Sequence, residues 1–180
     1  MGMTIHYTLK SNAQNDGEVK EIIKSLHTAA ESIPFKDVSD IVEMNGEKCE
    51  RGVGDQNEMM RFQASVTCGF ETAEQIIGFR VVVGDGCELL NIALARHPHS
   101  DVWAFTGWCK TQHASHPSNG GMENFHRCHM AVIDLLDEAE QLGIVESVED
   151  DTGYWRHRGI GLMDAKMSEM NTLVAAVADQ

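Results

Sequence analysis

Basic residues are scarce in this chain of 180 residues. Only 14 Lys and Arg stand against 28 Asp and Glu, which gives a formal net charge of −14. A surface of that sign repels phosphate backbones and anionic lipid headgroups, so neither nucleic acid nor membrane partners are expected. The segment from Met130 to Asp151 holds eight acidic residues and no Lys or Arg. We interpret it as a solvated helix face and loop, with a docking surface for a basic partner as the alternative.

Long apolar runs are also missing. No window approaches the roughly 18 apolar residues of a membrane-spanning helix. The first ten residues, MGMTIHYTLK, lack the apolar core of a signal peptide, so a cytoplasmic location is expected. Five widely spaced cysteines without a C-x-x-C pair are then expected to be free thiols, because that compartment is reducing. These are Cys49, Cys68, Cys87, Cys109 and Cys128.

Motifs that would identify a reaction are absent as well. The chain has no Walker loop, dinucleotide fingerprint, serine elbow or H-E-x-x-H sequence. No internal repeat, low-complexity tract or linker divides it, and residues 1–180 are expected to form a single domain. The sequence therefore identifies no reaction by itself, and candidate sites have to be inferred from clusters of reactive side chains.

The alternation of apolar and polar residues predicts several strands. In the first strand Ile5, Tyr7 and Leu9 share one face, and Gly84-Asp85-Gly86 predicts a tight hairpin turn between two later strands. Charged residues and three glycines between Asn45 and Asn57 predict a loop. The expected strands are Thr4–Leu9, Asp37–Met44, Met60–Phe70, Gln75–Val83, Cys87–Ala95, Asp101–Cys109 and Ile144–Val148.

Apolar residues at helical spacing predict three helices, over Asp16–Ile33, Met122–Leu142 and Leu162–Ala178. No helix is expected between Met60 and Cys109, where a doubly wound parallel sheet would need crossover helices. The predicted fold is therefore α+β: a single two-layer sandwich with a mostly antiparallel sheet of five to seven strands and the three helices packed on it.

Reactive side chains concentrate in one region. Six of the nine histidines lie between His97 and His129, together with Cys109 and Cys128. Imidazole and thiol groups transfer protons, attack electrophiles and bind metals. This region is therefore where chemistry is expected, although the crowding does not say which chemistry.

One hypothesis is a nucleophilic cysteine. Cys109 stands beside Lys110, whose charge would favour the thiolate, and His113 or His129 would act as the base. Lys110 or Arg158 would hold an anionic group of the substrate. Acyl transfer or hydrolysis of an unidentified small molecule would follow. The alternative is that Cys109 is a small buried residue at the end of a strand.

A second hypothesis is a zinc site, although no cofactor is firmly implied. The predicted ligands are His113, His116 and His126, completed by Cys109 or Cys128, because zinc needs three or four such donors. On a helix, positions 126 and 129 are about 60° apart and could point into one site. The spacing matches no zinc-finger pattern, and His129 could instead be a hydrogen-bonded core residue.

A third set of residues predicts the rim of a ligand site. Tyr154, Trp155 and Arg158 lie in a polar loop, and aromatic side chains combine an apolar body with a polar tip. Gln112 and Glu88 are added to this ligand-binding set, Glu88 on condition that it points inward and meets Lys110 or Arg158. The alternative is a loop anchored by Trp155 with Arg158 paired to the acidic helix.

These residues leave three functions open. The first is a small-molecule enzyme built on the Cys/His/Lys cluster. The second is a non-catalytic module that binds a ligand or another protein chain, with a homo-oligomer as one form. The third is a zinc-binding protein.

Overall fold

The computed structural model describes residues 2–49 and 72–178 and contains a seven-stranded sheet. The strands run in the order β2-β4-β5-β6-β1-β7, with β3 also paired to β4, and each of these pairs is antiparallel. They are β1 Thr4–Ser11, β2 Asp37–Val38, β3 Val42–Asn45, β4 Gln75–Val82, β5 Leu90–Arg96, β6 Trp103–Lys110 and β7 Val145–Asp150.

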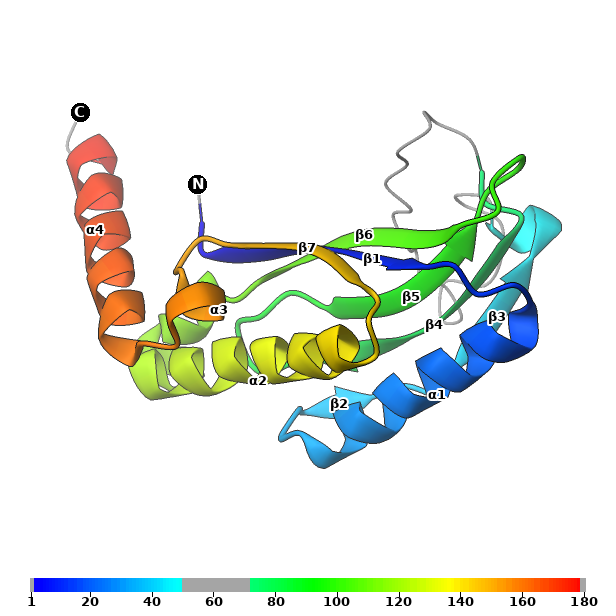
Figure 1. Ribbon diagram of the computed structural model, residues 1–180. Coiled ribbons are helices and arrows are strands. Elements are labelled where there is room, and N and C mark those ends of the chain that lie inside the picture. Colours follow the sequence, from blue (N-terminus) through cyan, green and yellow to red (C-terminus); the bar gives the residue numbers. More distant parts are fainter. Residues whose placement is uncertain (1, 50–71, 179–180) are drawn as a thin grey trace.

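Four α-helices accompany the sheet: α1 Asp16–Ser32, α2 Gly121–Gln141, α3 Tyr154–His157 and α4 Ile160–Ala178. Three short 3₁₀ helices span Gly46–Cys49, Gln112–Ser115 and Pro117–Asn119. The helices α1 and α2 lie side by side along one side of the sheet (Figure 1). The predicted α+β sandwich with a mostly antiparallel sheet is therefore confirmed.

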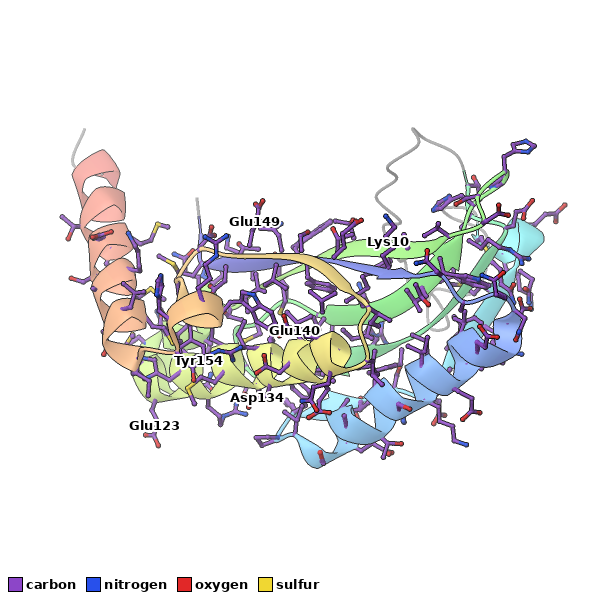
Figure 2. The ribbon with its side chains drawn as sticks, viewed as in Figure 1. Lys10, Glu123, Asp134, Glu140, Glu149 and Tyr154 are labelled. Atoms are coloured by element: carbon purple, nitrogen blue, oxygen red, sulfur yellow. The ribbon has the colours of Figure 1, made fainter. Side chains whose placement is uncertain are left out.

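Alternation along β1 explains how the core forms. Ile5, Tyr7 and Leu9 are buried, and Ile5 and Leu9 lie opposite Cys109 and Phe105 of β6. Directly opposite residues of neighbouring strands share a face, so both strands send these side chains toward the helices. Each fully buried large apolar side chain contributes about 1.5–3 kcal/mol. Figure 2 shows side chains filling the layer between the sheet and α1 and α2.

The helices supply the other half of this core. Helix α1 begins after Asn15, whose side chain accepts a hydrogen bond from the backbone N–H of Glu18 at 3.1 Å. It ends before Pro34, as a proline two residues past the helix would require. Helix α2 ends before Gly143, which has a φ of 72°. The buried residues of both helices repeat at helical spacing: Val19, Ile23, Leu26, Ala30, Phe125, Val132, Leu136 and Ala139.

The hairpin predicted at Gly84-Asp85-Gly86 is confirmed. The backbone N–H of Cys87 donates to the carbonyl of Gly84 at 3.2 Å, and Gly86 has a φ of 78°. A positive φ at the third residue of a tight turn favours glycine. Strand β5 begins at Leu90 and not at Cys87.

Two other predicted segments differ. The strand expected over Asp37–Met44 is divided into β2 and β3, both paired with β4. Between them, the backbone N–H and the hydroxyl of Ser39 bond to the backbone of Arg80. The predicted strand Met60–Phe70 and most of the loop Asn45–Asn57 lie outside the described residues.

Helix α4 stands at the end of the molecule where α2 begins (Figure 1). Its first turns bury Met163 and Met167, and Asp164 lies 2.7 Å from the imidazole of His126 on α2. None of the helices in the described ranges combines the length and apolarity needed to cross a membrane.

Candidate functional site

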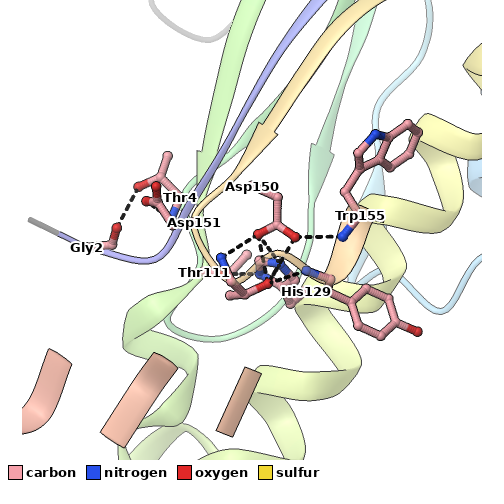
Figure 3. A network of polar contacts seen from close by, with 9 residues as sticks. Gly2, Thr4, Thr111, His129, Asp150, Asp151 and Trp155 are labelled. Carbon is pink, nitrogen blue, oxygen red and sulfur yellow. Dashed lines mark hydrogen bonds and ion pairs between the residues drawn. The ribbon is translucent and has the colours of Figure 1, made fainter. Parts of the chain in front are cut away.

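A buried polar network joins α2 to the end of β7 (Figure 3). Its centre is His129, which has no exposed surface. The Nδ1 atom of His129 lies 2.8 Å from the hydroxyl of Thr111, and Nε2 lies 3.0 Å from the carboxylate of Asp150 and 3.1 Å from the hydroxyl of Thr152. Both ring nitrogens therefore have partners, as a buried imidazole requires.

The carboxylate of Asp150 holds the loop that follows β7. It accepts hydrogen bonds from the backbone N–H groups of Thr152 and Trp155, both at 2.8 Å. Burial acts to raise the pKa of Asp150, but the hydrogen bond and charge of His129 and the bonds from Trp155 and Thr152 lower it to about 2. Asp150 is therefore ionised at neutral pH. Because both partners are sealed from solvent, the pair braces the loop and cannot contact a substrate.

The structure gives no support to Cys109 as a nucleophile. Its side chain is completely buried, and its Sγ donates to the backbone carbonyl of Glu88 at 3.4 Å. Burial, followed by the charges of Glu88 and Cys128, raises the pKa of the Cys109 thiol well above its ordinary value. Lys110 does not counteract this effect, because neighbouring residues on a strand point to opposite faces.

The two proposed bases of Cys109 lie in different environments. His113 is exposed on the 3₁₀ helix Gln112–Ser115, whereas His129 is buried. Glu88 is exposed, and its backbone N–H donates to the carbonyl of Lys110 at 2.9 Å. Gln112 is half-buried, and its Oε1 is buried without a hydrogen-bond partner. Glu88 therefore does not meet the condition, that it points inward, on which its place in the ligand-binding set depended.

The predicted zinc ligands are not brought together. The Nδ1 atom of His116 lies 2.7 Å from the hydroxyl of Ser118, and His126 turns toward Asp164 of α4. The expectation that His126 and His129 point into one site is wrong, because His129 faces Asp150. Within residues 2–49 and 72–178, no three His, Cys, Asp or Glu side chains are arranged to hold a metal ion.

The aromatic residues of the predicted rim lie close together around Arg158. The guanidinium of Arg158 lies 5.8 Å from the ring centre of Tyr154 and 5.0 Å from that of Trp155. It also donates two hydrogen bonds, of 2.8 and 2.6 Å, to the carboxylate of Asp137 on α2. Arg158 is therefore engaged within the chain, in agreement with the alternative that pairs it with the acidic helix.

Open grooves lie elsewhere on the described surface. One, of about 600 Å³, lies between the start of α2 and α4, and another, of about 770 Å³, lies beside the start of α1. Neither of these two grooves is lined by a residue of the predicted sites. Their lining residues are Met122, Asp164, Met167, Ser168, Asn171 and Thr172 in the first, and Ser11, Asn12, Ala13, Asn15, Gly17, Glu18, Glu21 and Ile22 in the second.

A further candidate surface is the side of β6, β1 and β7 that faces away from α2, which we call the open face. Trp108 lies there in β6 with 38% of its surface exposed. His6 of β1 is directly opposite Trp108, and Glu149 of β7 is directly opposite His6. The three residues therefore form one row across three strands, and all three are exposed.

Polar side chains flank this row. The hydroxyls of Thr8 and Thr106 lie 3.0 Å apart, and Lys10 forms a salt bridge of 2.8 Å with Glu146. Figure 2 shows Lys10 and Glu149 on the side of the sheet that faces away from α2. The alternation in β1 that buries Tyr7 places His6 on this opposite face.

Comparison with known protein families, curated proteins and solved structures finds no match to this chain, so its function has to be inferred from its own geometry.

Proposed function

We propose that this chain is a protein-interaction module that binds a second copy of itself through the open face. The observation that carries the proposal is Trp108, a large aromatic side chain exposed in the middle of a strand. Exposing it to water costs free energy that burial in an interface would recover. Trp is enriched at the centre of protein interfaces, where a polar rim surrounds an apolar anchor.

Charge favours a second copy as the partner. With a net charge of −14, most parts of the surface repel the same parts of another copy. The open face carries both signs of charge, with Lys10 on β1 and Lys110 on β6, and with Glu146 and Glu149 on β7, where Glu146 pairs with Lys10. A twofold interface brings one patch against itself, so it needs both signs of charge within that patch.

The catalytic alternative has less support. Cys109 and His129, the expected nucleophile and base, have no exposed surface through which a substrate could reach them. His113 is exposed, but it lies on a different element from either residue. A binding surface requires only side chains that are accessible, and Trp108, His6 and Glu149 meet that requirement.

The test is the molar mass of the protein, measured by light scattering over a wide range of concentration. The wild-type mass should rise toward twice the chain mass of 19.9 kDa. Trp108→Lys should weaken association by about 30-fold or more, since truncating a central anchor costs about 2 kcal/mol or more.

The matched control is Leu142→Lys, which places the same charge on an apolar residue that is 42% exposed at the end of α2. This variant should associate like the wild type. A wild-type mass that stays at one chain at every concentration would overturn the proposal, and so would equal weakening by the two variants.

A further inference from the structure

A separate cluster of reactive groups lies where the β4–β5 hairpin meets α2. Cys87 lies at the end of the hairpin turn that packs on Cys128 of α2. The backbone N–H of Cys87 donates to the carbonyl of Gly84 at 3.2 Å, and the Sγ of Cys128 lies 4.0 Å from the backbone oxygen of Val83. Cys87 is partly exposed, whereas Cys128 is completely buried. The fold therefore joins two thiols that are far apart in the sequence, and only one of them faces solvent.

The side chain of Arg127 is fixed beside this pair. Its Nη2 lies 3.3 Å from the Sγ of Cys128 and donates to the side-chain oxygen of Asn124 at 2.7 Å. Its Nη1 donates to the backbone carbonyl of Pro34 at 2.9 Å. Three acceptors thus hold one guanidinium in place, and its positive charge stays next to the sulfur.

The hairpin turn is packed directly against the same sulfur. A Cβ atom on Gly84 would lie 2.5 Å from the Sγ of Cys128 and 2.8 Å from Nη2 of Arg127. The side chain of Asn124 also donates to the backbone carbonyl of Asp85 at 3.0 Å. The backbone N–H of Cys87 donates to the carbonyl of Gly84 and closes the turn, which holds Cys87 next to α2.

These contacts favour a negative charge on Cys128. The hydrogen bond from Cys87 and the charge of Arg127 lower the pKa of Cys128 to about 7, against the opposing effects of burial and Asp85. The same hydrogen bond and burial raise the pKa of Cys87. At neutral pH the pair therefore carries a substantial fraction of one thiol and one thiolate sharing a proton.

We propose that Cys87 and Cys128 form a dithiol site that reduces hydroperoxides and closes into a disulfide. This activity goes beyond the proposed binding function and uses a different part of the molecule. Cys87 is the residue that a small oxidant in solution can reach, and Cys128 is the neighbouring thiolate that completes the reaction. Reactive redox cysteines are commonly accessible and placed next to a resolving cysteine.

The reaction balances in two steps. The Cys128 thiolate takes the proton of the Cys87 thiol, and the sulfur of Cys87 attacks one peroxide oxygen and breaks the O–O bond. The leaving hydroxide then takes that proton from Cys128 to become water, which restores the Cys128 thiolate. Cys87 is now a sulfenic acid. The Cys128 thiolate then attacks the sulfur of Cys87, the S–O bond breaks, and hydroxide leaves as the disulfide forms. The two sulfurs together lose two electrons, and the peroxide gains them.

The fully buried Cys109 has no part in this reaction. Its sulfur donates to the carbonyl of Glu88, and its raised pKa keeps it protonated. Cys49 offers a matched control, because it is partly exposed like Cys87 but lies on a different element, the 3₁₀ helix Gly46–Cys49.

The test treats the reduced full-length protein with hydrogen peroxide and maps disulfides by mass spectrometry of proteolytic peptides. The expected product is a peptide pair linked through Cys87 and Cys128, with two thiols lost per chain. Cys49→Ser should form the same link at the same rate. Cys128→Ser should instead accumulate a sulfenic acid on Cys87, which dimedone traps.

A second variant, Arg127→Gln, gives a test that does not depend on whether Cys128→Ser folds. Arg127→Gln keeps both thiols, and it should slow disulfide formation at neutral pH about fivefold, because it lowers the thiolate fraction of Cys128. A disulfide mapped to any other pair, Cys68 included, would overturn the proposal. Loss of thiols at an unchanged rate in Cys87→Ser would overturn it as well.

Discussion

The imidazole of His129 and the carboxylate of Asp150 lie 3.0 Å apart, and their side chains are 0% and 1% exposed. Removing one partner would leave the other buried without its main contact, which typically costs about 3–5 kcal/mol. Asp150→Asn should therefore lower the free energy of unfolding by about 3 kcal/mol at neutral pH, measured by urea denaturation. Asp164→Asn is the control: it breaks the contact with the half-exposed His126, and about 1 kcal/mol or less is expected.

The contribution of Asp150 should also depend on pH. Its pKa is about 2 in the folded protein and about 3.9 in an unfolded chain. A lowered pKa stabilises the folded state fully above the unfolded value, and this stabilisation is lost as the pH falls through the folded value. The stability difference between wild type and Asp150→Asn should therefore shrink between about pH 4 and pH 2. A difference that stays constant over that range would contradict the assignment.

Gly78 tests the packing of β4 on β5. A Cβ atom at this position would lie 2.4 Å from the backbone oxygen of Ile92 and 2.8 Å from the Cα of Ala93. Backbone atoms of a central strand cannot move aside cheaply, so Gly78→Ala should cost about 1–3 kcal/mol in thermal unfolding. Gly161→Ala places a Cβ in open space within α4 and should leave the stability equal or slightly higher. Equal effects of the two substitutions would contradict this register.

Cys109 should be the slowest described cysteine to react with iodoacetamide in the folded protein. Its thiol is sealed in the core and its pKa is raised, so both access and thiolate fraction are low. Cys49 is partly exposed and serves as the comparison within the same molecule. Peptide mapping over a time course measures both rates. Labelling of Cys109 as fast as that of Cys49 would show that the β6 strand opens readily.

Arg158 connects α3 to α2 through geometry that lysine cannot reproduce. It pairs with Asp137 through two nitrogens and covers the rings of Tyr154 and Trp155. Since the pair is partly exposed, Arg158→Ala should cost about 1 kcal/mol or less. Arg158→Lys should cost nearly as much, because an ammonium neither bonds twice nor stacks. Lys166→Ala, which breaks an exposed pair with Glu169, is the control. Full stability of Arg158→Lys would contradict the stacking role.

Local patterns in the sequence predict much of the fold. Alternation identified the inward face of β1 through Ile5, Tyr7 and Leu9, and glycine chemistry identified the turn at residues 84–86. Both features depend on neighbouring residues alone, and this is why a single sequence reveals them. The division of Asp37–Met44 into two strands depends instead on the bonds between Ser39 and Arg80, which belong to different parts of the chain.

The candidate sites depended on long-range contacts and were predicted less well. Sequence adjacency suggested that Lys110 activates Cys109, but strand geometry directs the two side chains to opposite faces. Spacing on a helix suggested that His126 and His129 share a site, whereas α4 supplies a partner for one and β7 for the other. Cys87 and Cys128 approach each other because the hairpin turn packs on α2, and no local pattern in the sequence indicates such packing.

The fluorescence of Trp108 reports directly whether this residue becomes buried when two copies associate, as proposed. Trp103→Phe and Trp155→Phe together leave Trp108 as the only one of the three tryptophans in the chain. Circular dichroism should first establish that this double variant keeps its fold. Its emission should then shift to shorter wavelength as the concentration rises, in step with the rise in molar mass. An emission maximum typical of a solvated indole at every concentration would contradict the claim.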